Sequence, residues 1–150
     1  REANARIDQQ EQFATLRRLK FFHEFSHAEI WEVLRASAWR EYAPGEAIVR
    51  EGEIDDRFYI LVGGECRVER NGTEVGRIET GACFGETGYV KGARRTASIV
   101  AATPVTALKV SATLLEQVSA ACQLRFNRVF LKTLITRLQS TEAGVARVLA

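Results

Sequence analysis

The sequence predicts an α+β fold that is mainly β, with helices at both ends of a strand-rich centre. Apolar residues recur at helical spacing in residues 1–36 and 111–150, whereas short β-like runs fill residues 39–110. Within that centre, turn signals such as Pro44-Gly45 and Asn71-Gly72 recur about every ten positions. Regular short strands at this spacing are typical of a sandwich or a small barrel.

Residues 1–36 are expected to form two helices. The first is polar and should run from about Glu2 to Lys20. The second should begin at Ser26, because Glu29 follows three residues later and the pair has the spacing of a capping box. Apolar residues then follow at helical spacing, as expected for a helix with one buried face.

Residues 39–110 are expected to form the strands. The runs AIV, FYILV, CRVER, TEVGRI, ASIVA and VTALKV are rich in β-branched and aromatic residues and are separated by glycine or proline. Asn71-Gly72 lies between CRVER and TEVGRI, and this dipeptide is a strong signal for a two-residue hairpin turn.

Residues 111–150 are expected to be helical again, with an unusually wide apolar stripe. One row of apolar side chains has a four-residue spacing and consists of Phe126, Phe130, Leu134 and Leu138, and a neighbouring row consists of Leu124, Leu131 and Ile135. The plain interpretation is a helix that covers the barrel, and the alternative is a helix that also contacts a partner or a ligand, since the stripe is wider than a single contact needs. No local sequence feature attaches this helix to the barrel.

The composition is that of one ordinary globular domain spanning residues 1–150, with 46% hydrophobic and 27% charged residues. A net charge of +2 gives no general attraction to nucleic acid or to anionic membranes, and no apolar run approaches the roughly 20 residues of a membrane span. Three separated cysteines, Cys66, Cys83 and Cys122, are interpreted as reduced, buried thiols of a cytoplasmic protein. Because the sequence starts at Arg1 and contains no methionine, we interpret it as part of a longer protein.

The segment FGETGYVKGARRTAS, residues 84–98, brings an acid and two adjacent arginines together with small residues. Gly85 permits a positive φ or the close approach of a ligand. A short helical turn starting at Glu86 would present unpaired amides, which favour an anion. Arg95 adds a planar fork that matches two phosphate oxygens, and the Glu86 carboxylate is a good acceptor for a ribose hydroxyl.

These residue types together indicate a nucleotide whose sugar and phosphate lie close to each other. Residues 21–110 carry 11 basic and 14 acidic residues, so their net charge does not attract an anion. An anionic ligand there requires a local binding site such as the one in residues 84–98. The alternative interpretation of the same residues is a plain salt bridge between Glu86 and Arg95.

The segment resembles the phosphate-binding cassette of the cyclic nucleotide-binding domain family, whose pattern is F-G-E, a short apolar helix and R-x-A-[ST]. This chain has Phe84-Gly85-Glu86 and Arg95-Thr96-Ala97-Ser98 at those positions, and RRTAS is especially similar to the cassette of cyclic nucleotide-gated and hyperpolarisation-activated channels. Upstream, Gly52 to Ile60 match the family pattern G-[ED]-x-x-[DN]-x-[FY]-[YF]-I. The chain departs from the family at Thr87 and Tyr89, where apolar residues are usual.

The resemblance covers roughly residues 13–140. It implies an eight-stranded β-roll, a double-stranded β-helix, flanked by N-terminal helices and closed by a C-terminal lid helix, with cAMP or cGMP as the ligand. Carried over, Arg95 binds the cyclic phosphate with the Thr96 hydroxyl and the Ala97 amide, and Glu86 and the Gly85 backbone hold the ribose 2′-hydroxyl. The remaining residues that the resemblance places at the ligand are Gly88 in the wall, Val68 and Ile78 against the base, and Arg137 of the lid at the purine. Arg94 is expected to face solvent.

The function that the resemblance implies is a non-catalytic sensor of cyclic nucleotides. Its effector would lie outside this chain, in a channel, a kinase, another enzyme or a DNA-binding domain. A homodimer through the C-terminal helix is also expected, without direct contact to nucleic acid or membrane. Thr96 is typical of cGMP-preferring members, whereas channel domains with RTAS bind both nucleotides, so the preference stays open.

Other classes of protein with a small barrel fit less well. A cupin-type metalloenzyme needs two or three histidines on inner strands, and this chain has only His23 and His27, both before the barrel and separated by the expected cap at Ser26. A serine or cysteine nucleophile would likewise lack a nearby histidine. A catabolite-activator-type transcription regulator remains the main alternative, although residues 140–150 are too few for a helix-turn-helix. A degenerate domain that only dimerises is disfavoured by the intact Glu86 and Arg95.

Overall fold

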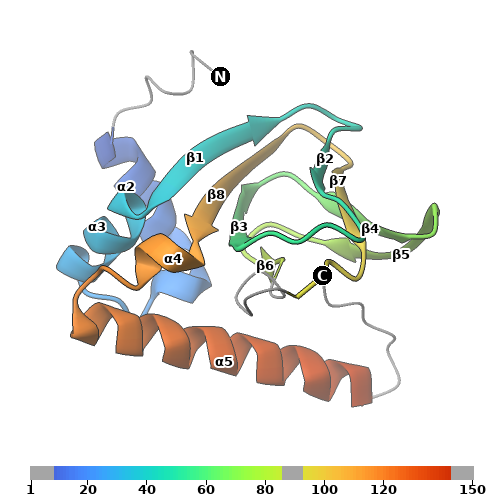
Figure 1. The fold of residues 1–150 in the computed structure, drawn as a ribbon. Coiled ribbons are helices and arrows are strands. Elements are labelled where there is room, and N and C mark those ends of the chain that lie inside the picture. The colour runs from blue at the N-terminus through green and yellow to red at the C-terminus, as the bar shows by residue number, and fades with distance from the viewer. Residues whose placement is uncertain (1–8, 86–92, 143–150) are drawn as a thin grey trace.

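A computed structural model describes residues 9–85 and 93–142, and Figure 1 shows two groups of strands with helices along two sides of them. The helices are α2 (Gln9–Arg18), η1 (Lys20–Phe22), α3 (His27–Arg35), α4 (Ala112–Leu115) and α5 (Ala120–Glu142). The strands are β1 (Ser37–Tyr42), β2 (Ala47–Val49), β3 (Arg57–Gly63), β4 (Cys66–Arg70), β5 (Thr73–Ile78), β6 (Cys83–Phe84), β7 (Ser98–Ala101) and β8 (Val105–Ser111). None of these helices is long and apolar enough to cross a membrane.

The strands form two four-stranded antiparallel sheets with the orders β1-β8-β3-β6 and β2-β7-β4-β5. Successive residues of a strand point to opposite faces, so the first sheet has two buried faces with different partners. Tyr59 and Leu61 point inward and pack against the second sheet, whereas Phe58 and Ile60 point outward and pack against the helices. The predicted eight-stranded β-roll with helices on either side of it in the chain is confirmed.

Two local predictions are confirmed in detail. The Ser26 hydroxyl accepts from the Glu29 amide at 3.2 Å, and the Glu29 carboxylate accepts from the Ser26 amide at 2.9 Å, so the capping box starts α3. Asn71 and Gly72 both have positive φ, 54° and 79°, which is the backbone of the hairpin turn that Asn-Gly favours.

The N-terminal helix differs from its predicted extent. Its described part ends at Arg18 because Leu19 adopts extended φ and ψ angles of −78° and 137°. The following residues form the separate helix η1, whose Phe21 and Phe22 are buried in the core. Burial of these two aromatic side chains overrides the continuous helix that the polar pattern predicts.

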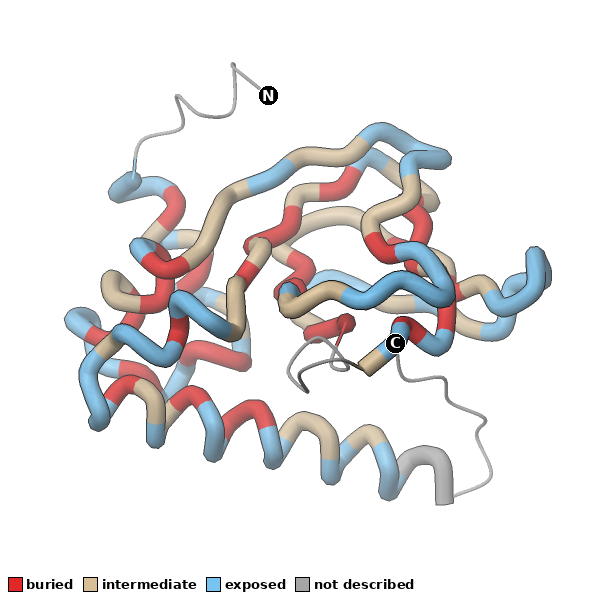
Figure 2. Tube along the Cα trace, viewed as in Figure 1, coloured by how far each residue is buried: buried red, intermediate tan, exposed pale blue. Residues whose placement is uncertain are grey.

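An aromatic cluster attaches α5 to the rest of the fold. Phe126 is fully buried, and its ring lies 5.3 Å from Phe21, 5.4 Å from Phe58 and 6.0 Å from Phe130, measured between ring centroids. Figure 2 shows the consequence along α5, whose buried turns face the body of the molecule and whose exposed turns face away.

Carboxylates of the N-terminal region provide further attachment, which the sequence did not indicate. We call the three residues Glu24, Glu29 and Glu32 the carboxylate row. They contact α5 at its start and along its first half: Glu32 accepts from the Ser119 amide (2.7 Å) and hydroxyl (2.9 Å), Glu29 pairs with Arg125 (3.4 Å) and Glu24 pairs with Lys132 (2.5 Å). These partners lie about 90 to 110 residues apart, so they cannot be matched from one sequence, and they do not conflict with the absence of a local feature that attaches the helix.

Candidate functional site

Arg95 is the residue for which the sequence predicts an anion contact, and it lies three residues before the start of β7. The residue is only 2% exposed. Its backbone is held on both sides, because its amide donates to the Glu53 carbonyl at 2.8 Å and its carbonyl accepts from the Gly52 amide at 2.9 Å. These two hydrogen bonds with Gly52 and Glu53 fix the position of the Arg95 backbone, from which its side chain extends into the roll.

The Arg95 guanidinium lies among backbone carbonyls and one carboxylate. Nη1 donates to the Gly85 carbonyl at 2.8 Å, Nη2 donates to the Arg57 carbonyl, and Nη2 also lies 3.5 Å from Asp55 Oδ2. A buried charge is tolerated only when it is paired and hydrogen-bonded in this way. The arrangement holds a permanent cation at a defined point beside Gly85.

Asp55 is a site residue that sequence reasoning missed. It belongs to the matched segment before β3, where the family pattern marks a different acidic position, and it meets Arg95 only through the fold. Its side chain is about one-quarter exposed and also accepts from the Arg57 amide at 3.0 Å. Asp55 is thus positioned to orient the Arg95 guanidinium.

Gly85 satisfies the predicted need for a residue without a side chain. Its φ is 79°, in the left-handed region, and a Cβ atom there would lie 3.1 Å from Arg95 Nη1 and 3.4 Å from the Phe58 Cα. Any larger residue would strain the backbone and push against the arginine at the same time.

The two adjacent arginines have opposite surroundings, as predicted. Arg94 is exposed, and its Nη1 donates to the Gly52 carbonyl at 2.9 Å across the surface, whereas Arg95 is buried. Thr96 is exposed and its carbonyl accepts from Arg70 at 3.1 Å, while Ala97 is fully buried.

The residues expected at the base lie on paired strands. Val68 of β4 is buried and Ile78 of β5 is partly buried, and both belong to the apolar interior of the roll. Glu86 and Gly88, which complete the predicted set, lie outside the described residues.

Arg137 brings α5 to the same region. Its Nη2 donates to the Cys83 carbonyl at 2.6 Å, and Cys83 precedes Gly85 by two residues on β6 and the segment after it. Helix α5 and Arg95 therefore both donate to backbone carbonyls of the short segment from Cys83 to Gly85.

Tyr59 adds a second feature that the sequence did not mark. Its ring stacks on Phe84 with centroids 5.0 Å apart and planes 7° apart. Burial, and then the neighbouring Asp55 charge, raises the pKa of Tyr59 to about 12, against the opposing effect of Arg95. The phenol therefore stays neutral and serves as a rigid wall beside Gly85.

The described residues contain a buried guanidinium and no group suited to a metal ion. No group of three or more histidine, cysteine or acidic side chains in the described ranges could hold a metal ion, and all three cysteines are buried free thiols. His23 follows η1 and His27 begins α3, so the capped break that the sequence predicted separates them.

Comparison with known proteins agrees with this geometry. The family profile described as "Cyclic nucleotide-binding domain" matches residues 39–122. A cGMP-dependent protein kinase from Eimeria tenella is 32% identical over 117 residues, which cover 77% of this chain and 12% of the kinase. A cAMP-dependent protein kinase regulatory subunit from Mycosarcoma maydis is 35% identical over 85 residues, 54% of this chain and 16% of the subunit.

A solved structure supports the fold. The crystal structure of a cyclic nucleotide-binding domain from Methylobacillus flagellatus superposes with a TM-score of 0.77 and 21% identity, covering 91% of this chain and 81% of that one. The chain spans only a small part of these two relatives, 12% of the kinase and 16% of the regulatory subunit.

Proposed function

Because this chain belongs to the cyclic nucleotide-binding domain family, we propose that it is a regulatory module that binds cAMP or cGMP and has no catalytic activity of its own. The observation that carries the proposal is the buried Arg95 guanidinium, held in contact with the backbone of Gly85, a residue with no side chain and a positive φ. A cyclic nucleotide presents one anionic phosphate fused to a ribose, and a fixed bidentate donor matches its two exocyclic oxygens.

Each predicted residue has a role in this proposal. Arg95 binds the cyclic phosphate, with the Thr96 hydroxyl and the Ala97 amide as further donors. The Glu86 carboxylate and the Gly85 backbone hold the ribose 2′-hydroxyl. The other contacts are Gly88 in the wall, Val68 and Ile78 at the base, and Arg137 of α5 at the purine. Asp55 keeps the Arg95 guanidinium oriented while the site is empty.

The effector lies outside this chain in our proposal. The relatives include kinases named for cGMP and a regulatory subunit named for cAMP, which is consistent with either ligand here. A kinase, a channel, another enzyme or a DNA-binding domain could receive the signal, and we place the module in the cytoplasm.

We expect one cAMP, or one cGMP, to bind per chain. The physical reason is that the buried cation and the adjacent left-handed glycine occur once in the described residues. Isothermal titration calorimetry on protein purified free of nucleotide measures the stoichiometry and the affinity. Absence of heat, together with absence of a thermal shift with both nucleotides, would refute the sensor and favour a domain that only associates with other chains.

Glu86→Gln should weaken binding of cAMP more than binding of 2′-deoxy-cAMP. The carboxylate's proposed partner is the 2′-hydroxyl, and a hydrogen bond to a charged group contributes about 1.5–3 kcal/mol. Titrating both proteins with both ligands forms a double-mutant cycle. Purely additive losses would mean that Glu86 pairs with another group, such as Arg95.

Arg137→Ala should lower cAMP affinity about fivefold, the equivalent of one hydrogen bond of about 1 kcal/mol. In hydrogen exchange, cAMP should protect the amides of residues 126–138 in the wild type and protect them less in the variant. Gln139→Ala, an exposed neighbour on α5, is the matched control and should behave as wild type. Equal protection of residues 126–138 with and without nucleotide would show that α5 is a static cover.

A further inference from the structure

A cavity of about 350 Å³ lies between helix η1, helix α5 and the turn that precedes β6. Its lining in the described part of the chain includes none of the residues that we assign to the cyclic nucleotide. The volume is at the lower end of the range in which small-molecule sites are found. The cavity is therefore a candidate for a second, different ligand, and we call it the η1–α5 cavity.

The floor of the η1–α5 cavity is apolar. It is formed by Phe21 of η1 and Val129 of α5, which are only 5% and 6% exposed. The Phe21 ring is held from below by Phe126, with the two ring centroids 5.3 Å apart. Gly81 adds a stretch of backbone to the wall, and its amide donates to the Leu61 carbonyl at 2.8 Å. A compact apolar group would be buried favourably against these side chains.

The rim of the cavity carries more positive than negative charge. Lys20 and His23 approach it from η1 and the residue after it, Lys132 approaches it from α5, and Glu24 is the one acid among the described lining residues. Glu24 is already paired with Lys132 at 2.5 Å, and this contact holds the pKa of the Glu24 carboxyl below its ordinary value. The two charges therefore neutralise each other.

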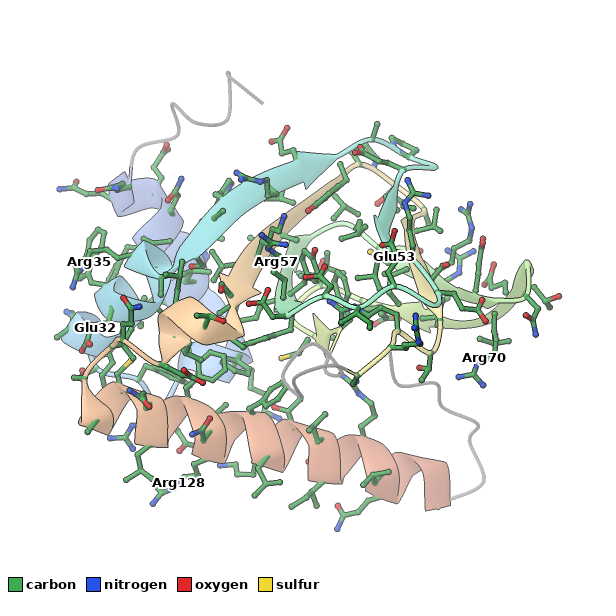
Figure 3. All side chains as sticks on the ribbon, viewed as in Figure 1. Glu32, Arg35, Glu53, Arg57, Arg70 and Arg128 are labelled. Carbon is green, nitrogen blue, oxygen red and sulfur yellow. The ribbon has the colours of Figure 1, made fainter. Side chains whose placement is uncertain are left out.

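Lys20 supplies the positive charge that is left over. It is exposed and forms no ion pair with any residue in the ranges 9–85 and 93–142. Arg128 strengthens the positive field, since it also lowers the pKa of Glu24, but Figure 3 shows its side chain extending away from the rest of the molecule. The cavity thus combines an apolar floor with one unpaired cation at its rim.

We propose that the η1–α5 cavity binds a small organic acid, a monocarboxylate with a compact apolar body such as an aryl-alkanoic acid. Its carboxylate would accept charge-assisted hydrogen bonds from Lys20, and its apolar body would lie on Phe21 and Val129. The hydroxyls of Thr133 and Thr136, which also line the cavity, already donate to the Val129 and Lys132 carbonyls, so the lysine is left as the donor that recognises the anion.

The same charges disfavour other classes of ligand. A cationic ligand would be repelled by Lys20, and a ligand with several negative charges would be repelled by Glu24. A neutral ligand with the same apolar body would gain the contact with the floor but leave the lysine without a partner. The cavity is therefore expected to select by the charge of the head group as well as by the apolar body.

The position of the cavity gives its occupant a mechanical consequence. The turn at Gly81 leads into β6, where the Cys83 carbonyl accepts from Arg137, and Arg137 directly follows Thr136 of the cavity wall. A ligand that contacts both η1 and α5 binds only while these helices are together, so it favours that arrangement. The acid would thus hold α5 against η1 from outside the nucleotide site.

Titration of 3-phenylpropionate into the ¹⁵N-labelled 150-residue chain, followed by NMR, tests the proposal. We expect saturable binding with a Kd of about 1 mM or tighter, with the largest amide shifts at Phe21, Gly81 and Val129. 3-Phenylpropan-1-ol should bind at least about threefold more weakly and 3-phenylpropylamine at least about tenfold more weakly, because the head group loses or reverses its charge. No saturation by about 20 mM, or largest shifts at Val68 and Ala97 inside the roll, would overturn the proposal.

Two variants and one control test the residues. Lys20→Glu should weaken 3-phenylpropionate binding at least about tenfold, because it reverses the charge at the rim. Thr136→Trp, at an exposed position of α5, should fill the cavity and block the acid and the alcohol alike. Arg40→Glu changes an exposed arginine of β1 outside the cavity and should bind as wild type.

Equal affinity of wild type and Lys20→Glu, or an equal loss in Arg40→Glu, would refute a specific contact at the rim. Titrating the same samples with cAMP reports separately on the site around Arg95. The proposal for the η1–α5 cavity and the proposal for the nucleotide site can therefore fail independently of each other.

Discussion

Arg95→Ala is expected to weaken binding of cAMP or cGMP by about 2–5 kcal/mol, a loss of roughly 30- to 5,000-fold. Arg95 is the one buried cation among residues 9–85 and 93–142, and it lies beside Gly85, so the substitution would leave a desolvated phosphate without its partner. Calorimetric titration of both nucleotides measures the loss directly.

Arg94→Ala is the matched control, because Arg94 is adjacent, equally charged and exposed. It should change affinity by less than about 1 kcal/mol. The Arg95→Ala substitution also removes the guanidinium donor from the Gly85 and Arg57 carbonyls. The thermal unfolding of the Arg95→Ala variant must therefore be measured together with its affinity. Arg95→Lys separates the effects, since it keeps a cation but loses the fork. Equal losses of affinity at positions 94 and 95 would show that the assignment of Arg95 to the phosphate is wrong.

Phe126→Ala is expected to lower the free energy of unfolding by about 3–5 kcal/mol, the usual range for a buried phenylalanine. Phe126 is fully buried and contacts aromatic rings from η1, β3 and α5 itself, so the cavity would open where these three elements meet. Urea denaturation followed by circular dichroism gives the change in free energy.

Leu124→Ala, two residues earlier on the same helix, provides the comparison. Its side chain is 68% exposed, and the expected change is within about 0.5 kcal/mol. A similar loss for both variants would mean that intrinsic helix stability, and not the aromatic cluster, keeps α5 in place.

The features that were predicted correctly from sequence depend on neighbours in the chain. The capping box joins residues three apart, and the hairpin turn needs only Asn71 and Gly72. Gly85 and Arg95 belong to one continuous segment, and the structure places them in direct contact, while their role in ligand binding stays a prediction.

The features that were missed depend on pairs far apart in the chain. Asp55 lies 40 residues before Arg95, and Glu24 lies 108 residues before Lys132. One sequence gives no means of choosing among the many acids and bases that could pair at such distances. The stacking of Tyr59 on Phe84 is missed for the same reason, since β3 and β6 become neighbours only in the folded sheet.

The rows on α5 show a subtler limit. Phe126, Phe130, Leu134 and Leu138 follow one four-residue spacing, yet Phe126 and Phe130 are buried, Leu134 is partly buried and Leu138 is 50% exposed. The spacing is correct, but a straight row on a helix drifts around its axis, and the helix also extends beyond the aromatic cluster that buries its start. Periodicity predicts the face of a helix and not the length over which that face is covered.

The carboxylate row has a consequence for engineering. Its three acids come from residues 24–32, on the N-terminal side of the roll in the chain, yet they contact Ser119, Arg125 and Lys132 near the opposite end of the sequence. A reporter protein fused ahead of α2 would therefore be mechanically linked to α5 without touching it. Neutralising Glu24 and Glu29 together would weaken this linkage, while the packing of Phe21 on Phe126 and the contacts of Arg95 stay in place. The response of a sensor built on this domain could therefore be adjusted from its N-terminal end.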